Sequence, residues 1–209
     1  MSDSLFLHDQ RKALRRELRR RRRALTPHAR RHADRALCRR LRGLPEVRRA
    51  RRVALYLPND GEIDVTPLLA WLRRRGARAY LPVLRPLSDN RLWFVHYHDA
   101  TPMIANRFGI QEPQTRHGAH RARRLPPWAL DLVLLPLVGF DEQGNRMGMG
   151  GGFYDRSFAF SRANSGPRPR LIGVAHDCQR VERLPIASWD VPLDAIVSDA
   201  RIIRPSRSQ

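Results

Sequence analysis

The sequence is poor in cysteine, with only Cys38 and Cys178, which stand far apart in the chain. Such a pair gives neither the CxxC spacing of a zinc site nor the framework of a disulfide-stapled domain. We therefore expect a protein of the reducing cytoplasm, whose fold depends on a hydrophobic core rather than on cross-links.

Long apolar runs and aromatic residues are also scarce. The longest apolar run, residues 132–138, is far too short to span a bilayer, and the first residues are charged, unlike a secretory signal. We expect no membrane partner. Because aromatic residues make up only 7% of the chain, stacking platforms for single-stranded nucleic acid are sparse.

Lysine is nearly absent, whereas arginine is abundant. Lys12 is the only lysine among 40 basic residues, and 20 acidic residues leave a formal net charge of +20. Such a charge suits nucleic-acid binding, a field that steers an anionic substrate, or drift in the composition of a solvated surface. Basic residues are densest at the N-terminus but spread along the whole chain, which favours the last two alternatives over a nucleic-acid partner.

Hydrophobic periodicity and capping signals predict one domain, residues 1–209, in which helices alternate with strands. Two N-terminal helices cover about 8–42, the second capped by Thr26, and another helix follows the capping residue Thr66. A tail of about 203–209 should fray. The helices are expected at 8–24, 26–42, 66–76 and 153–161, and the strands at 53–56, 77–83, 92–97, 131–137, 171–175 and 195–198.

This alternation is typical of an α/β fold. We expect a mostly parallel sheet flanked by helices in three Rossmann-like layers, with a basic N-terminal helical segment. Ligands of such sheets bind beyond the carboxyl ends of the strands. Residues 100–127 carry few regular signals, and we interpret them as a long excursion that could serve as a lid.

The most informative segment joins a buried strand to a helix through glycine. Arg146-Met-Gly-Met-Gly-Gly-Gly-Phe-Tyr-Asp155 holds four glycines in five positions. A strand, a glycine loop and a helix bring backbone N–H groups and a helix N-terminus onto a phosphate. The segment lacks the Gly-Lys-Ser/Thr end of a P-loop, and Phe153 stands where a Rossmann fingerprint starting at Gly148 needs glycine. The pattern favours a nucleotide-phosphate site, and a glycine turn that only lets strand and helix pack closely is the alternative.

Five segments, in order over about residues 9–199, resemble the 5-formyltetrahydrofolate cyclo-ligase family. The glycine segment, with the preceding residues 136–144, is the most specific of them, and Met147 replaces a commoner leucine at little change in volume. The other four are Arg11-Lys-Ala-Leu-Arg15, Leu55-Tyr-Leu57 with Gly61-Glu-Ile-Asp64, Arg107-Phe-Gly-Ile-Gln-Glu-Pro113 and Trp189-Asp-Val-Pro-Leu-Asp194.

The resemblance implies an ATP- and magnesium-dependent ligase of one-carbon metabolism. ATP phosphorylates the formyl oxygen of 5-formyltetrahydrofolate, N10 attacks the activated carbon, and phosphate leaves, which gives 5,10-methenyltetrahydrofolate, ADP and phosphate. Phosphoryl transfer needs positioning and charge neutralisation more than a nucleophilic side chain. The sequence offers no convincing Ser/His/Asp or Cys/His set, in agreement with that chemistry.

The resemblance also implies roles for individual residues. Arg146 and Tyr154 would be catalytic, and Asp155 and Asp190 would hold Mg²⁺. The folate-binding residues would be Arg15, Leu57, Glu62, Phe108 and Tyr154. The ATP-binding residues would be Arg11, Lys12, Ala13, Leu14, Arg15, Arg146, Met147, Gly148, Met149, Gly150, Gly151, Gly152, Phe153 and Tyr154.

Simpler interpretations stand beside these roles. Arg146 could be one solvated arginine among many, Asp155 a carboxylate that answers a helix dipole, Leu57 a core residue and Phe108 an anchor for its loop. Two other functions are open: a basic nucleic-acid-binding protein, whose binding would weaken steeply with salt, or another α/β phosphoryl-transfer enzyme. We expect a monomer, and the basic surface would suit an anionic, polyglutamylated folate.

Overall fold

The structure is a computed structural model and describes residues 2–86, 90–115, 124–162 and 168–205. Its helices are α1 (Ser2–Arg23), α2 (Pro27–Gly43), α3 (Pro45–Arg49), α4 (Leu68–Arg74) and α5 (Phe153–Ser157), with the 3₁₀ turns η2 (Pro127–Ala129), η3 (Ala159–Arg162) and η4 (Asp177–Gln179). The strands are β1 (Arg52–Ala54), β2 (Arg78–Leu84), β3 (Leu92–Tyr97), β4 (Met103–Ala105), β5 (Gln111–Pro113), β6 (Arg124–Leu125), β7 (Leu132–Pro136), β8 (Gly139–Phe140), β9 (Arg146–Met147), β10 (Arg170–Ala175), β11 (Ala195–Ser198) and β12 (Ile202–Ile203).

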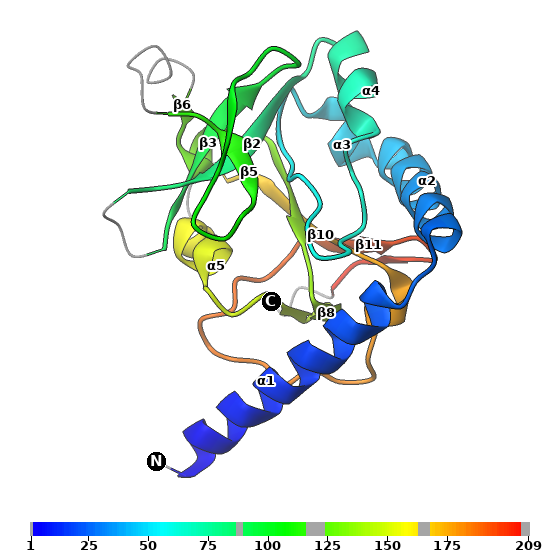
Figure 1. The fold of residues 1–209 in the computed structure, drawn as a ribbon, viewed down its shortest axis with the longest axis vertical. Coiled ribbons are helices and arrows are strands. Elements are labelled where there is room, and N and C mark those ends of the chain that lie inside the picture. Colours follow the sequence, from blue (N-terminus) through cyan, green and yellow to red (C-terminus); the bar gives the residue numbers. More distant parts are fainter. Residues whose placement is uncertain (1, 87–89, 116–123, 163–167, 206–209) are drawn as a thin grey trace.

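Eight strands form the central sheet, in the order β12-β11-β10-β7-β1-β2-β3-β6 (Figure 1). The inner pairs from β11 to β2 are parallel, and the outer pairs that involve β12, β3 and β6 are antiparallel. The expected α/β fold with a mostly parallel sheet is therefore confirmed. Two short antiparallel pairs, β4–β5 and β8–β9, lie outside this sheet.

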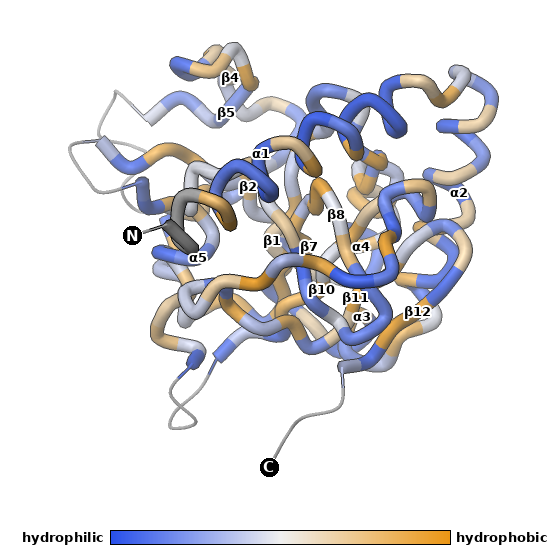
Figure 2. Tube along the Cα trace, turned by 90° about the horizontal axis from the view of Figure 1, so that it is seen from below, coloured by the Kyte–Doolittle hydropathy of each residue, from blue (hydrophilic) through white to orange (hydrophobic). Residues whose placement is uncertain are grey.

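Both faces of the sheet are covered by hydrophobic cores. Val53 of β1 belongs to the core that includes residues of α2, α3 and α4, whereas its neighbour Ala54 belongs to the opposite core, which includes Phe158 after α5. Successive strand residues point to opposite faces, so a strand buried on both faces is apolar throughout. This explains the unbroken apolar run at β7. Figure 2 shows the hydrophobic strands inside a more hydrophilic shell.

Several element boundaries differ from the prediction, three of them at the starts or ends of helices. α1 begins at Ser2 rather than residue 8, since nothing in the first residues breaks a helix. Thr66 does not cap α4: Pro67 occupies the N-cap position, with no side-chain cap bond, and the Thr66 N–H donates to the carboxylate of Asp64. The helix predicted at 153–161 ends at Ser157, where the chain turns to bury Phe158 and then forms η3.

Two irregular segments were predicted with too little structure. Within 100–127, β4 and β5 form a hairpin and β6 joins the large sheet, whereas residues 116–123 lie outside the described part of the chain. A lid role for this segment stays a prediction. The tail predicted to fray from 203 is wrong at its start, because Ile203 pairs with Ile196 in the sheet. Residues 206–209 are not described.

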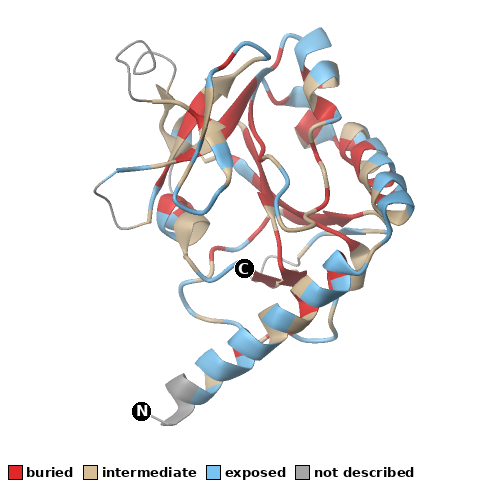
Figure 3. Ribbon diagram, viewed as in Figure 1, coloured by how far each residue is buried: buried red, intermediate tan, exposed pale blue. Residues whose placement is uncertain are grey.

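α1 lies across the edge of the sheet at which β7 and β10 end (Figure 1). Leu18 of α1 is fully buried and packs on Gly139, where any Cβ would clash with the leucine side chain. Figure 3 shows buried residues along one side of this otherwise exposed helix. Among the described residues, none of the helices is both long and apolar enough to cross a membrane.

Candidate active site

A stripe of arginines on α1 faces the carboxyl ends of the strands. Arg11, Arg15, Leu18 and Arg22 recur every three or four positions and so share one face of the helix. Arg11 and Arg22 are buried, and Arg15 is half-buried, whereas Lys12 is exposed. This basic helix therefore has a buried side made largely of guanidinium groups, and buried charges require partners.

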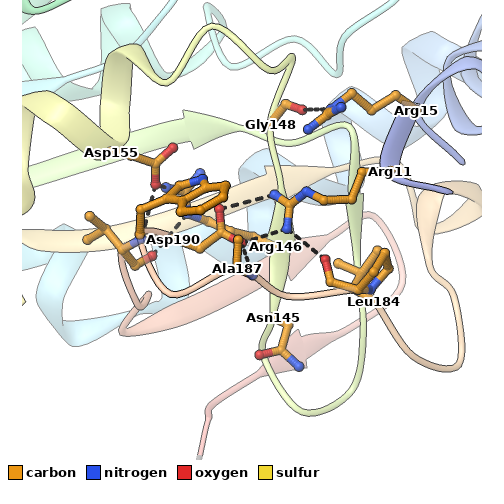
Figure 4. A network of polar contacts seen from close by, with 12 residues as sticks. Arg11, Arg15, Asn145, Arg146, Gly148, Asp155, Leu184, Ala187 and Asp190 are labelled. Atoms are coloured by element: carbon orange, nitrogen blue, oxygen red, sulfur yellow. Dashed lines mark hydrogen bonds and ion pairs between the residues drawn. The ribbon is translucent and has the colours of Figure 1, made fainter. Parts of the chain in front are cut away.

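Arg11 finds its partner near the other end of the chain. Its Nη1 and Nη2 donate to the carboxylate of Asp190 at 2.9 and 3.1 Å, and Nη1 also donates to the Pro185 carbonyl at 2.6 Å (Figure 4). The backbone N–H of Ala187 donates to the same carboxylate. A bidentate arginine–carboxylate pair is both strong and geometrically specific, so Arg11 fixes the C-terminal motif against α1.

The glycine segment forms a loop between β9 and α5 that needs its glycines. Gly150 has φ +99° and Gly152 has φ +67°, backbone conformations that other residues rarely adopt. From outside, Arg15 Nε donates to the Gly148 carbonyl at 2.9 Å and Asn90 Nδ2 donates to the Gly151 carbonyl at 3.0 Å.

Several backbone donors of this loop have no partner among the described residues. Within the described residues, no hydrogen bond uses the N–H of Gly150 or of Gly151, while the carbonyls of Gly148 and Gly151 are bound by side chains. A loop whose carbonyls are held and whose N–H groups are unused suits an anion such as phosphate.

Arg146 connects three segments of the site. Its guanidinium is buried, its Nε donates to the Val191 carbonyl at 3.1 Å, and it forms an ion pair with Asp155 of α5. The Val191 N–H donates to the same Asp155 oxygen at 3.0 Å. The alternative of a solvated Arg146 is therefore wrong. The arginine ties β9, α5 and the C-terminal motif together.

Asp155 and Asp190 provide a donor set that fits magnesium. Both carboxyl side chains are 17% exposed, and Mg²⁺ is commonly held by one or two carboxylates together with phosphate oxygens and water. Each carboxylate is also the partner of an arginine, so a bound cation would compete with that arginine. The described residues contain no group of three or more acidic, histidine or cysteine side chains arranged for a metal.

A second group of predicted residues gathers where β1 ends. Leu57 is half-buried and packs on the core that includes α2 residues, in agreement with its simpler structural interpretation. Burial raises the pKa of Glu62 to about 6, an effect opposed by the Arg22 charge and by the Asn59 N–H. Burial also raises the pKa of Tyr154, and the negative charge of Glu62 raises it further. Glu62 and Tyr154 therefore lie close enough to interact electrostatically.

Phe108 lies in the turn of the β4–β5 hairpin and is 54% exposed. It makes an edge-to-face contact with Phe153 of α5, with ring centroids 5.9 Å apart, and the Arg107 guanidinium lies 5.0 Å from its ring centroid. Arg107 also donates to the side chain of Asn90. The hairpin thus reaches the glycine loop, and Phe108 presents much of its ring to solvent at this rim.

The predicted ATP-binding residues differ widely in exposure. Lys12 and Ala13 are exposed, Leu14 is half-buried, and Met149 is 52% exposed in the glycine loop. Met147 is completely buried in the protein interior, so its side chain is not available to a ligand. Any contact between Met147 and ATP must therefore be made by its backbone.

Sequence reasoning missed Asn90 and Arg22. Asn90 stands beside a short polar turn and carries no signal of its contact with the glycine loop. Arg22 could have been found, because it continues the stripe of Leu14 and Leu18 along one face of the helix.

A cavity of about 500 Å³ adjoins the Arg11 ion pair and is lined by Gln143, Asn145 and residues 182–186.

Comparison with known proteins gives one consistent result. A profile of the 5-formyltetrahydrofolate cyclo-ligase family matches residues 8–199. The chain is 42% identical over 186 residues to the 5-formyltetrahydrofolate cyclo-ligase of Escherichia coli K12, covering 88% of this chain and 98% of that protein. It is 41% identical over 183 residues to the enzyme of the same name from Haemophilus influenzae, covering 88% and 94%. The solved structure of Aquifex aeolicus 5,10-methenyltetrahydrofolate synthetase has a TM-score of 0.76 at 31% identity, covering 95% of both chains.

Proposed function

Because the chain belongs to the 5-formyltetrahydrofolate cyclo-ligase family, we propose which of its residues bind each reactant. The protein converts 5-formyltetrahydrofolate to 5,10-methenyltetrahydrofolate with ATP. Its ATP side is the glycine loop with Arg11, Arg15 and Arg146, and its folate side is Glu62, Tyr154 and Phe108. The observation that carries this assignment is that α1 and α5 bring both groups to one edge of the sheet.

The ATP phosphates bind over the glycine loop. The unused N–H groups of Gly150 and Gly151 and the adjacent guanidinium of Arg15 supply donors and positive charge to a polyanion. Arg146 is catalytic in the sense that its charge offsets the charge developing on the transferred phosphoryl group, while its bond to the Val191 carbonyl keeps it in place.

Asp155 and Asp190 hold Mg²⁺ beside these phosphates. Support comes from the donor set itself, two carboxylates on segments that Arg11 and Arg146 bring together. Bound there, the ion would neutralise phosphate charge. The two arginines would then turn from the carboxylates towards phosphate oxygens, which are acceptors of the same kind.

The folate binds between Glu62, Tyr154 and Phe108. An ionised Glu62 accepts hydrogen bonds from the N–H-rich edge of the pterin, and the exposed Phe108 ring offers an aromatic face. Because burial raises its pKa, Tyr154 stays protonated and acts as a hydrogen-bond donor rather than a base. Leu57 and Arg15 complete this side of the site.

The reaction then proceeds in two steps. The formyl oxygen attacks the γ-phosphorus, the bond to the ADP oxygen breaks, and the formyl carbon becomes electrophilic. N10 attacks that carbon, a C–N bond forms, the carbon–oxygen bond to phosphate breaks, and N10 loses its proton. The protein contributes positions and charges, since neither step needs a covalent enzyme intermediate.

A direct assay tests the activity. Purified protein, 5-formyltetrahydrofolate and Mg-ATP should give the absorbance of methenyltetrahydrofolate, and omission of ATP should abolish it. Correctly folded protein that forms no product would refute the activity. Product formation that persists unchanged when EDTA removes divalent cations would refute the magnesium assignment alone.

We also propose a cytoplasmic monomer that accepts polyglutamylated folates. Both Cys38 and Cys178 are free thiols, which suits a reducing compartment. The exposed arginines would attract an anionic polyglutamate tail. Light scattering tests the monomer, and comparison of KM for mono- and polyglutamylated substrates tests the tail preference.

A further inference from the structure

The turn after β1 holds a residue in an unfavourable backbone conformation. Asp60 has φ 52° and Gly61 has φ 75°, and the Glu62 N–H donates to the Asn59 carbonyl at 3.0 Å, which makes residues 59–62 a turn of type I′. A non-glycine residue in the left-handed region persists where its surroundings over-determine it. Glu62 follows directly, so its position depends on whatever holds Asp60.

Three arginines of α1 hold Asp60. Arg19 Nε donates to its carboxylate at 2.7 Å, Arg23 binds the other carboxylate oxygen, and Arg22 Nη2 donates at 2.9 Å. Arg22 differs from the other two because its Nε also donates to the Asp60 backbone carbonyl at 2.9 Å and its side chain is completely buried. Among these three arginines, only Arg22 therefore binds both the backbone and the side chain of Asp60.

Arg22 also reaches Glu62. Its Nη2 lies 3.9 Å from Glu62 Oε1, about 1 Å beyond hydrogen-bond distance. Its Nη1 is buried and, among the described residues, has no hydrogen-bond partner. The guanidinium thus has spare donor capacity next to a carboxylate that is only 12% exposed.

We propose that Arg22 is a positioning residue for folate binding: it fixes the 59–62 turn and keeps the Glu62 carboxylate aimed at the substrate. This inference rests on the proposed role of Glu62. One rigid helix then serves both reactants, since Arg15 holds the glycine loop and Arg22, seven residues later and about 10 Å along the axis, holds the folate carboxylate.

The charged and titratable groups around Glu62 support this role. From α1, Arg22 and, more weakly, Arg19 lower its pKa; Asp60 in the turn raises it. The buried hydroxyls of Tyr56, after β1, and of Tyr154, on α5, also feel the Glu62 charge. Arg22 has the largest effect of the charged groups, so removing it should push the pKa of Glu62 above its present value of about 6.

The first test replaces Arg22. Arg22→Gln should raise KM for 5-formyltetrahydrofolate about tenfold or more, with kcat and KM for ATP changed less than about twofold. It should also move the acidic limb of kcat/KM for the folate up by about one pH unit. Arg22→Lys, which keeps the charge, should return the acidic limb to its wild-type pH and should reverse part of the increase in folate KM. Arg20→Gln is the matched control, since Arg20 is an exposed arginine of the same helix that pairs with Glu17 and not with the turn, and should change neither quantity.

A double-mutant cycle makes the outcome independent of any loss of stability. If Arg22 acts through Glu62, Arg22→Gln should raise the folate KM little in a Glu62→Gln background. Additive effects of the two substitutions, or an acidic limb that does not move in Arg22→Gln, would overturn the inference. A Glu62→Gln variant with an unchanged folate KM would instead refute the proposed role of Glu62 itself, so the two failures are distinguishable.

Discussion

Glu62 is ionised at a site that little water reaches, and the resulting loss of folding stability can be measured. Burial raises the pKa of Glu62 to about 6, above the value expected in the unfolded chain. The folded state therefore binds this proton more tightly, and its ionisation reduces stability as pH rises through the range between the two pKa values. Above about pH 6 the whole penalty is present, up to about 2 kcal/mol.

Glu62→Gln should consequently stabilise the protein at pH 8 by up to about 2 kcal/mol while it weakens folate binding. The gain should vanish at pH 4, where both states of the wild-type residue are largely protonated. Thermal denaturation at the two pH values measures it. A variant less stable than the wild type at pH 8 would mean that attraction to Arg22 outweighs the burial penalty.

Asp155 is bound by Arg146 and by the Val191 N–H, so its loss affects both structure and catalysis. Asp155→Asn should cost about 1–3 kcal/mol of stability, because a buried guanidinium loses its carboxylate. If the residue holds magnesium, the variant should also need a much higher Mg²⁺ concentration for half-maximal rate. Chemical denaturation and a Mg²⁺ titration of the initial rate measure the two effects.

Asp131→Asn is a matched control for this experiment. Asp131 accepts from Arg52 and from two backbone N–H groups where β1 begins, at the opposite edge of the sheet. Its loss should lower stability and leave the Mg²⁺ dependence unchanged. An unchanged Mg²⁺ dependence in Asp155→Asn as well would contradict the metal assignment.

The location of single residues could be predicted where they belong to a sequence motif. It could not be predicted where only burial in the fold distinguishes them. Arg146, Asp155 and Asp190 were expected at one site, and in the structure Arg146 and Asp155 both bind the backbone of Val191, the residue after Asp190. A run of arginines on one helix looks uniform in sequence, so buried Arg22 could not be told from its exposed neighbours without the helical period. Asn90 acts only through tertiary contact.

At the scale of elements, the glycine loop depends on backbone conformations that a side chain disfavours. Gly150→Ala adds a Cβ only 3.5 Å from the Arg15 guanidinium, an ordinary contact, so its penalty comes from φ +99°. Strain of about 1 kcal/mol or more should distort the loop and raise KM for ATP about tenfold, with a smaller effect on the folate KM. Steady-state kinetics with each substrate varied measures this.

Gly43→Ala serves as the control. Gly43 ends α2, has no positive φ, and a Cβ there meets open space. Alanine should leave both KM values unchanged and alter stability by less than about 1 kcal/mol, in the favourable direction. Equal kinetic effects of the two substitutions would contradict a specific role for the loop.

The β4–β5 hairpin brings an exposed aromatic ring to the folate side. Phe108→Ala should change stability by less than about 0.5 kcal/mol because the ring is largely exposed, yet raise the folate KM several-fold. Trp128→Ala, at an equally exposed aromatic residue in η2, should change neither. A folate KM that does not respond to Phe108→Ala would contradict a substrate contact.

Elements with a strong periodic signal were predicted well, and those fixed by tertiary contacts were not. The long helix α2 and the strands β3 and β7 lie within a residue or two of their predicted bounds. The hairpin of β4 and β5 has no alternating apolar pattern, and its strands are partly exposed, so hydrophobicity could not reveal it. The early end of α5 depends on burial of Phe158, a packing effect.

At the scale of the whole molecule, the net charge of +20 should act on association rates. Because the field is screened within about 8 Å at physiological ionic strength, added salt should lower kcat/KM for a polyglutamylated folate more than for the monoglutamate. Stopped-flow or initial-rate measurements across a salt series check this. Equal salt effects on both substrates would mean that the net charge of the surface does not attract the polyglutamate tail.

The overall architecture followed from the alternation of helices and strands, which parallel sheets require. The antiparallel edge strands could not be predicted in the same way. β3 returns beside β2 after a short connection, and β6 and β12 have two residues each, too short for any pattern. Their pairing is decided by the free sheet edges they cover.

The ion pair between Arg11 and Asp190 joins residues 179 positions apart. During synthesis on the ribosome, Arg11 is made well before its partner, which follows 179 positions later. This part of the network therefore closes only after Asp190 has been synthesised. A nascent chain or a fragment that stops before this aspartate would carry the glycine loop but would lack the carboxylate that pairs with Arg11, and should be inactive.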